Sequence, residues 1–314
     1  PDYAVTGVQT CALPIYWMID GVRAKIVSGD TLVAMKAYGH FTAEMLSIYA
    51  NGADMTSAIN AAYDLPFVQN IYFGSDSSRT YVATGTVRPH YKSAQFSNNC
   101  ILDANAIDSV TVNASMYAQI FDSTTAVTNL RSNNNEISVI WWGAKISTSV
   151  DNRAPIQRAF NLAQTGRVVV PYGTMRVDGT LYLNEFLDLQ MEGTFTTSLS
   201  NAPLIVIGNS STTIYNRNYF IRIGRPTDAS TWTDSTNSGI RAYNPHSCTF
   251  EIPKNSGFYN NFELRAEGGA SVFNEINIWD SRDSKRHIYL NNIGTGYCTG
   301  NTFNGGSLIT QSGY

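Results

Sequence analysis

The sequence predicts an all-β solenoid in which each turn of the chain takes about two dozen residues. Two series of short apolar–polar–apolar segments alternate in the C-terminal third. One series starts at Phe250, Ile276 and Phe303, with steps of 26 and 27 residues, and the other at Ile240, Phe262 and Ile288, with steps of 22 and 26. The alternation within each segment indicates a strand with one face inward. Charged residues make up only 14% of the chain, below the ~25% of average domains, so uncharged polar residues fill the outward positions.

Residues 143–183 predict how the main solenoid begins. Pro155 suits the first position of a helix, where its missing N–H costs nothing. Ile156, Ala159 and Phe160 then fall on one face, so we expect a helix over 154–164. The β-branched run 168–170 predicts a buried strand, which the Pro-Tyr-Gly turn at 171–173 ends.

The same order of segments occurs upstream, in residues 51–87. Asn51-Gly52-Ala53-Asp54 precedes a helix that we expect over 57–64, and strands are expected near 71–73 and 80–82. Gly85-Thr86-Val87 then matches Gly179-Thr180-Leu181 of the later copy. Self-similarity of this kind indicates repeats, so the chain is expected to contain two tandem units.

Both copies resemble the opening of the right-handed parallel β-helix in the pectin lyase-like superfamily. Gly143-Ala144-Lys145, Ile156-Gln157 and Val170-Pro171-Tyr172-Gly173-Thr174 carry the match. The Gly-Asp-Gly and Asp-Asp that are usual in that family are mostly missing, and only Asp151 remains. The resemblance implies an all-β, right-handed, single-stranded parallel β-helix with short capping helices.

The segment between the two copies resembles a linker of phage and bacterial pectate-lyase-like proteins. In those proteins a strand like residues 114–122 precedes a segment like Trp141-Trp142-Gly143-Ala144-Lys145. Trp141 and Trp142 are either carbohydrate platforms or, as we prefer, side chains that close the core before the helix. The resemblance favours a phage tailspike or tail fibre.

The expected organisation has four parts. Residues 5–15 resemble a translated sequencing adapter, so 1–15 are interpreted as an artefact without function. Residues 16–50 are a connecting region, 51–140 the first opening unit with its linker, and 141–314 the main β-helix. Nothing near Tyr314 resembles a terminal cap, and a solenoid needs capped ends, so we expect a sequence truncated at its C-terminus.

Composition argues against several functional classes. A net charge of −3 gives no electrostatic drive toward nucleic acid, and no apolar run approaches the ~20 residues of a membrane span. Cys100, Cys248 and Cys298 have no metal-binding spacing, so three buried free thiols are expected rather than disulfides or zinc ligands. We expect no cofactor and no metal.

Outward carboxylates on neighbouring turns are the strongest candidates for chemistry. The 26-residue step places Glu275 over Thr249, two positions from Glu251, so their backbones are expected about 8 Å apart. That falls within the ~6.5–9.5 Å separation of inverting glycosidase carboxylates. A solvated polar face is the alternative reading of both residues.

The other polar residues are either weaker candidates for chemistry or residues with an expected structural role. Asp280 and Asp283, with Trp279 and Arg282 as sugar contacts, are expected in a loop between strands. Glu263 is expected to pair with Arg241 across turns, and Asn274 with Asn301 in an amide ladder. The four histidines, at positions 40, 90, 246 and 287, are scattered and are interpreted as surface or turn residues.

Three functions fit the sequence. The leading one is a phage tailspike or tail fibre that recognises and depolymerises a bacterial surface polysaccharide, as a glycoside hydrolase or polysaccharide lyase. The alternatives are a secreted pectate-lyase-like or polygalacturonase-like enzyme, and a non-catalytic structural or adhesin tail component. The phage resemblance implies a homotrimer in the complete protein, located in the virion tail in contact with other tail proteins. The present chain is expected to be monomeric or prone to aggregation.

Overall fold

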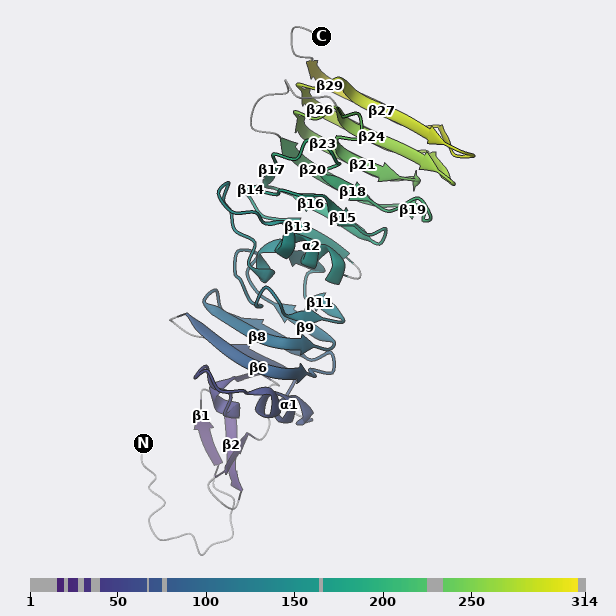
Figure 1. Cartoon of the computed structure of the whole chain (residues 1–314). Coiled ribbons are helices and arrows are strands. Elements are labelled where there is room, and N and C mark those ends of the chain that lie inside the picture. Colours follow the sequence, from purple (N-terminus) through teal and green to yellow (C-terminus); the bar gives the residue numbers. More distant parts are fainter. Residues whose placement is uncertain are drawn as a thin grey trace, which may run out of the picture.

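The computed structural model describes residues 16–19, 22–27, 31–34, 40–66, 68–74, 78–163, 166–224 and 234–309. Within these residues strands predominate and helices are short. Figure 1 shows an elongated molecule with its strands layered along the long axis, from α1 (Thr56–Asp64) near one end to β29 (Thr302–Ile309) near the other. The predicted all-β class is therefore confirmed. Residues 1–15, the predicted adapter, lie outside the described residues.

The described strands before residue 40 form a small antiparallel sheet, sheet A. It consists of β1 (Tyr16–Ile19), β2 (Val22–Val27) and β3 (Thr31–Ala34). Two or three residues separate consecutive strands, and only antiparallel strands can be joined so tightly. This sheet lies in the region 16–50, which we predicted as a connecting segment.

From residue 40 onward the described strands pair in parallel, first in two sheets between which the chain alternates. Sheet B contains, in spatial order, β11 (Leu130–Ser132), β9 (Val110–Asn113), β7 (Ser93–Phe96), β5 (Asn70–Phe73) and β4 (His40–Thr42). Sheet C contains β10 (Ala126–Val127), β8 (Cys100–Ile107) and β6 (Arg79–Val87). From β5 onward consecutive strands thus lie in different sheets, and each sheet grows by one strand per circuit of the chain.

The second group of parallel strands forms three sheets. Sheet D contains β12 (Glu136–Ser138), β13 (Gly166–Val170), β16 (Leu187–Met191), β20 (Asn218–Gly224), β23 (Thr249–Ser256), β26 (Glu275–Arg282) and β29, with β14 (Thr174–Arg176) and β17 (Thr194–Thr196) beside them. Sheet E contains β15 (Leu181–Leu183), β18 (Ile205–Ile207), β21 (Ser238–Tyr243), β24 (Asn260–Glu267) and β27 (Arg286–Ile293). Sheet F contains β19 (Ile214–Tyr215), β22 (Pro245–His246), β25 (Ala270–Val272) and β28 (Tyr297–Thr299). From β20 onward the chain visits sheets D, E and F in turn.

The predicted register of these strands is confirmed. In sheet D, Ile276 pairs with Phe250 on one side and Phe303 on the other. In sheet E, Phe262 pairs with Ile240 and Ile288. The period read from the sequence is therefore the length of one circuit through the three sheets.

Both predicted helices are present, and the segments around them repeat. The first opening unit runs β4, η1 (Glu44–Leu46), α1, β5; the second runs β12, η2 (Val139–Trp142), α2 (Arg153–Leu162), β13. Asp54 Oδ1 accepts from the backbone N–H of Thr56, and Asp151 Oδ1 from that of Arg153. Each aspartate therefore stabilises the start of its helix by satisfying an otherwise unpaired N–H.

An amide side chain from each helix bonds to the strand that the helix covers. Asn60 Nδ2 donates to the Thr86 carbonyl at 2.9 Å, and Asn60 Oδ1 accepts from Arg88 N at 2.7 Å. Gln157 bonds to the Tyr182 carbonyl and N–H in the same way, both at 2.8 Å. The amides take the place of a neighbouring strand, so the helices also satisfy backbone groups at an open sheet edge.

Aromatic side chains form a column inside the first group of sheets. Phe73 stacks on Phe96 at 5.1 Å between centroids, Phe96 meets Phe121 at 5.8 Å, and Phe121 meets Trp142 at 5.3 Å. Trp141 and Trp142 are both buried. The preferred reading of the tryptophans, as residues that close the core, is confirmed.

Each circuit passes from sheet F to sheet D through one residue with a left-handed backbone. These residues are Asn216 (φ 53°), Ser247 (φ 54°), Phe273 (φ 56°) and Gly300 (φ 63°). The residues that follow include Asn274 and Asn301, which form the predicted ladder: Asn274 Nδ2 donates to Asn301 Oδ1 at 2.8 Å. Asn274 Oδ1 also accepts from Cys248 N at 2.9 Å. The ladder ties three successive turns together.

Asp54 is expected to make the fold sensitive to acid. Its carboxylate accepts from the backbone and side chain of both Thr56 and Thr84, and these bonds hold the pKa of Asp54 well below its usual value. Because the folded pKa is the lower one, the stabilisation is present above about pH 4 and is lost as the pH falls further. Asp54→Asn should flatten the dependence of the melting temperature on pH between pH 5 and pH 3. Asp103→Asn serves as the control, and an unchanged dependence in Asp54→Asn would contradict this role.

Candidate carboxylate site on sheet D

The outer face of sheet D carries the two glutamates that the sequence singled out. In the last three strands, Glu251, Asn277 and Asn304 pair in register and form one row. Thr249, Glu275 and Thr302 form the row beside it. The predicted placement of Glu275, over Thr249 and diagonal to Glu251, is therefore confirmed.

Asn277 joins the two carboxylates. Its Nδ2 donates to Glu251 Oε1 at 2.5 Å and to Glu275 Oε1 at 3.3 Å. Its own Oδ1 accepts from Asn304 Nδ2 at 2.7 Å. An amide NH₂ has two hydrogens, so one side chain can hold both glutamates, and Asn304 fixes which way that amide points. The sequence reasoning missed Asn277 and Asn304, although the 26- and 27-residue steps align both with Glu251.

Trp279 completes the cluster. Its Nε1 donates to Glu251 Oε2 at 3.2 Å, so both oxygens of Glu251 are engaged. The Trp279 side chain is nevertheless 60% exposed, which leaves a ring face open beside a carboxylate. A large exposed aromatic ring with its N–H bonded is suited to packing against a sugar ring.

The shared amide holds the two carboxylates close together. Its two bonds keep Glu251 Oε1 and Glu275 Oε1 at most about 6 Å apart, which is short of the ~6.5–9.5 Å of inverting enzymes that the sequence predicted and nearer the ~5–5.5 Å of retaining enzymes. Glu275 is exposed and Glu251 half-buried.

The second predicted cluster lies in a strand, so the expected loop is wrong for most of it. Trp279, Asp280 and Arg282 belong to β26, and Asp283 alone occupies the following turn, with φ 49°. The buried residues of β26 include Ile276, Ile278 and then Ser281, so the alternation slips by one residue and both Trp279 and Asp280 face outward. Such an irregularity redirects a side chain without ending a strand.

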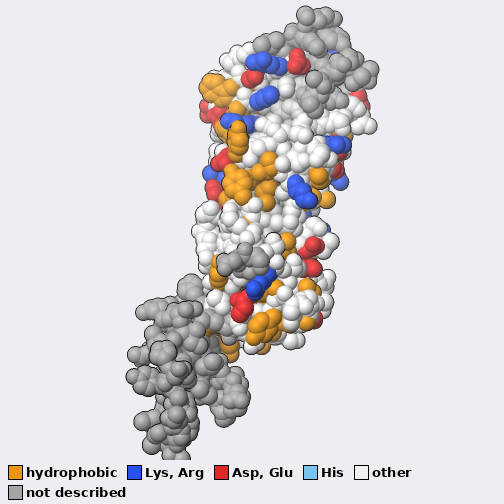
Figure 2. Space-filling model, turned by 90° about the vertical axis from the view of Figure 1, so that its left-hand side faces the viewer, with side chains coloured by type: hydrophobic (Ala, Val, Ile, Leu, Met, Phe, Trp, Pro, Cys, Tyr) orange, Lys and Arg blue, Asp and Glu red, His pale blue; other side chains and the backbone are white. Residues whose placement is uncertain are grey.

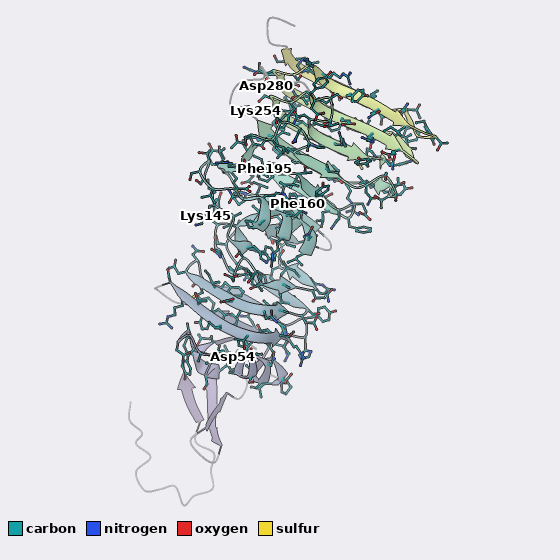
Figure 3. All side chains as sticks on the ribbon, viewed as in Figure 1. Asp54, Lys145, Phe160, Phe195, Lys254 and Asp280 are labelled. Atoms are coloured by element: carbon teal, nitrogen blue, oxygen red, sulfur yellow. The ribbon has the colours of Figure 1, made fainter. Side chains whose placement is uncertain are left out.

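The carboxylate of Asp280 forms an ion pair with a residue of its own strand. Arg282 Nε donates to Asp280 Oδ1 at 2.5 Å. Figure 3 places Asp280 close to Lys254, which comes from the adjoining strand β23. The mixture of charges at this edge is typical of an exposed ion-pair network, so Asp280 and Asp283 remain second to the glutamate pair.

Two shallow clefts lie on the same face, near the start of sheet D. One cleft, of about 290 Å³, is lined by Met116, Tyr117, Glu136, Arg167, Val169, Pro171, Gln190 and Glu192. The other, of the same volume, is lined by Asn134, Asn135, Glu136, Gly166, Arg167, Asp188 and Arg217. Glu136 and Arg167, which form an ion pair at 3.6 Å, line both clefts, so the two clefts adjoin. No local sequence pattern predicts these clefts, because Met116 and Tyr117 come from the linker.

One outward row of sheet D connects the clefts with Glu275, and Glu251 lies in the row beside it. Arg167 pairs with Asp188, and Asn218 N donates to Asp188 Oδ1. Asn218 pairs with Thr249, and Thr249 with Glu275. Four strand spacings separate Arg167 from Glu275, or roughly 19 Å.

Figure 2, a side view of the molecule, shows a surface that is mostly uncharged, with charged side chains scattered singly or in small groups.

Glu263 is a structural carboxylate, as predicted. Arg241 Nε donates to Glu263 Oε2 at 2.7 Å, and Ser238 and Asn291 also donate to this side chain. Glu263 is only 1% exposed. Both oxygens of this carboxylate are engaged, so neither is free for a substrate, and loss of one partner would leave a buried charge without compensation.

The described cysteines are free thiols. Cys100 and Cys248 are buried and Cys298 is half-buried, and burial raises the pKa of all three thiols. Thiols with a raised pKa are poor nucleophiles. The prediction of three free thiols is confirmed, with Cys298 less buried than expected.

His287 is more enclosed than a surface residue. Its Nδ1 lies 2.7 Å from Ser281 Oγ and 3.0 Å from Ser284 Oγ, while its buried Nε2 has no hydrogen-bond partner. Both serines are buried, so neither hydroxyl is open to a substrate. His287 is therefore a half-buried residue next to the turn between β26 and β27.

His287 should make stability depend on pH near neutrality. Burial lowers the pKa of His287, so the unfolded chain binds the proton first, and stability is lost as the pH falls below about 6.5. We therefore expect the melting temperature to drop between pH 7 and pH 5 through this group. His287→Gln should remove that part of the drop, whereas His90→Gln should leave it. Equal pH profiles for His287→Gln and the wild type would contradict the assignment.

Three further findings concern metal-binding groups, membrane-spanning helices and similar proteins. Within the described residues, no group of three or more His, Cys, Asp or Glu side chains is arranged to hold a metal ion. No helix in the same residues is long and apolar enough to span a membrane. Neither a protein family, nor a curated protein, nor a solved structure matches this chain.

Proposed function

We propose that this chain belongs to a phage tailspike or tail fibre that binds and depolymerises a bacterial surface polysaccharide. In this proposal its parallel sheets are the faces of a right-handed β-helix of the pectin lyase-like kind. The observation that carries the proposal is the pair Glu251 and Glu275, held by Asn277 on an exposed face beside Trp279. An acid and a base on opposite sides of a glycosidic bond are what its hydrolysis requires.

The surroundings of the pair support a polymeric substrate. Outward side chains repeat at each strand spacing from Arg167 to Glu275, so one linear molecule could contact several turns at once. The polymer would then make many contacts along the row, so its affinity would not depend on any single strong contact. A small substrate would need an enclosed pocket instead, and the two clefts on this face are shallow.

A binding-only tail component is the second candidate. It is favoured by one observation: both oxygens of Glu251 already accept hydrogen bonds, from Asn277 and Trp279. A carboxylate held in this way can orient a sugar hydroxyl without transferring a proton. A secreted pectate-lyase-like enzyme is the remaining alternative.

The proposed assembly follows from the same resemblance. We propose that the complete protein is a homotrimer in the virion tail, in contact with other tail proteins. Sedimentation velocity of the present chain measures its own state, and we expect a monomer or polydisperse aggregates. A stable trimer of this chain would contradict that expectation.

The experiment that tests the function uses the whole chain and an array of purified capsular and O-antigen polysaccharides. Binding is measured first, and release of new reducing ends from each bound polysaccharide is measured second. Binding with release supports the depolymerase. Binding without release supports the adhesin, and no binding to any polysaccharide contradicts both.

A further inference from the structure

Three aromatic side chains contact one another on the surface where sheet F meets sheet D. Tyr215 and His246 pair in register, and their tilted rings have centroids 5.2 Å apart. On the next turn Phe273, which directly follows the register partner Val272, meets the His246 ring edge to face at 5.8 Å. Tyr215 and Phe273 are 55% and 65% exposed. We call these three residues the aromatic ladder. It runs along the stacking direction of the strands.

Phe273 occupies a position that the fold does not favour for it. It has φ 56°, in a row where the other residues are Asn216, Ser247 and Gly300. Asparagine and glycine tolerate the left-handed backbone, whereas for a bulky residue it is an outlier. Neither the backbone nor the exposed ring gains from this placement, and such local conflicts concentrate at functional sites.

Gly300 keeps the end of the ladder open. A Cβ atom built on Gly300 would lie 2.7 Å from Cδ1 of Phe273. The Phe273 ring therefore rests over the glycine of the following turn. A larger residue at position 300 would displace the ring, so the last rung depends on this glycine.

The aromatic ladder borders the glutamate pair. Only the buried Asn274 separates Phe273 from Glu275 in the chain. Phe273 and Glu275 thus lie on either side of one corner, between sheets F and D. The ring centroids follow each other at 5.2 and 5.8 Å, which is close to the advance per sugar along an extended polysaccharide.

On the basis of the proposed polysaccharide-binding function, we propose that the aromatic ladder is a sugar-stacking strip that positions the polymer beside Glu251 and Glu275. Consecutive pyranose rings pack their C–H faces on Tyr215, His246 and Phe273. The polymer then runs along the stack, parallel to the row of outward side chains on sheet D. Phe273 and Tyr215 are positioning residues in this arrangement, and the glutamates remain the reacting groups.

The size of the ladder favours a glycan over a second copy of this chain. Two rings that are a little over half exposed and one partly covered ring offer roughly 300 Å² of surface. A stable protein interface buries about 800 Å² on each partner. A strip one side chain wide fits a linear polymer, which needs little width and gains from length.

The test compares three variants against the polysaccharide of the array that the wild type binds. Tyr215→Ala and Phe273→Asn remove two rungs. Tyr182→Ala is the matched control, since Tyr182 is 54% exposed but belongs to sheet E. We expect an affinity loss of about tenfold for each ladder variant and less than twofold for the control. Phe273→Asn should also keep or raise the melting temperature, by about 2 °C, because asparagine suits φ 56°.

The outcomes separate the ladder from the proposed function. Wild-type affinity in both ladder variants overturns the ladder and leaves the function standing. A change of oligomeric state in Phe273→Asn at unchanged glycan affinity also overturns it, in favour of a self-contact. No binding by the wild type to any polysaccharide overturns the function and the ladder together.

Discussion

Replacing Ile276 with aspartate is expected to prevent the chain from folding. Ile276 is fully buried in β26, between Phe250 and Phe303 of the neighbouring strands. An unpaired carboxylate at this position would be removed from water without a partner, which costs several kcal/mol. Because each turn stacks on the previous one, the loss would also uncouple the turns on either side.

Two controls distinguish burial of a charge from the substitution itself. Leu308→Asp makes a similar change in β29 at a side chain that is 47% exposed, and we expect that variant to fold. Ile276→Val keeps the site apolar and should cost about 1 kcal/mol. Soluble yield and far-ultraviolet circular dichroism measure all three. A soluble Ile276→Asp variant with a cooperative melt would mean that Ile276 is not part of a packed interior.

The spacing of apolar residues along the sequence was sufficient to predict the register of the strands. The apolar residues at 250, 276 and 303 recur because each fills the same inward position on successive turns. The two helices were predictable for a similar reason, since an apolar face and the aspartate before each helix are local signals. Local and periodic features need no knowledge of the rest of the fold.

What the sequence did not predict depends on contacts between distant segments. The slip in β26 turns both Trp279 and Asp280 outward. β26 keeps its register with β23, and β23 shifts register against β20, so the slip depends on strands that are distant in the sequence. The clefts need Tyr117 of the linker beside Arg167 of β13. The left-handed backbone of Phe273 was also hidden, because phenylalanine gives no turn signal.

The glutamate site contains residues that the sequence predicts and one residue that it does not. Glu251 and Glu275 were found because the 26-residue step brings them to adjacent strands. Their common partner Asn277 was overlooked, since an asparagine in a polar row carries no chemical signature of its own. The same 26-residue step aligns Asn277 with Glu251, so the complete outward row, and not only its acidic residues, marks the site.

Glu251→Gln and Glu275→Gln are each expected to lower the release of reducing ends by about 10²-fold or more. The amide keeps the size and shape of the side chain but neither gives up a proton as an acid nor takes one as a base. Asn277 lies within 3.3 Å of both carboxylates, so Asn277→Ala should also reduce the rate, through loss of alignment. Polysaccharide binding should stay within about twofold of the wild type in both glutamine variants, because the reacting groups contribute little to holding a long polymer.

Glu185→Gln provides the matched control, since it makes the same substitution at a half-buried residue in the turn before β16. Rate and affinity have to be read together. A lower rate at unchanged affinity assigns the glutamates to bond cleavage, whereas equal losses of rate and affinity assign them to binding. Full activity in both glutamine variants would place the reacting groups elsewhere in the protein. If the wild type binds the polysaccharide and releases no reducing ends, the hydrogen bonds that engage both oxygens of Glu251 describe an adhesin contact, and Glu251→Gln should then alter affinity alone.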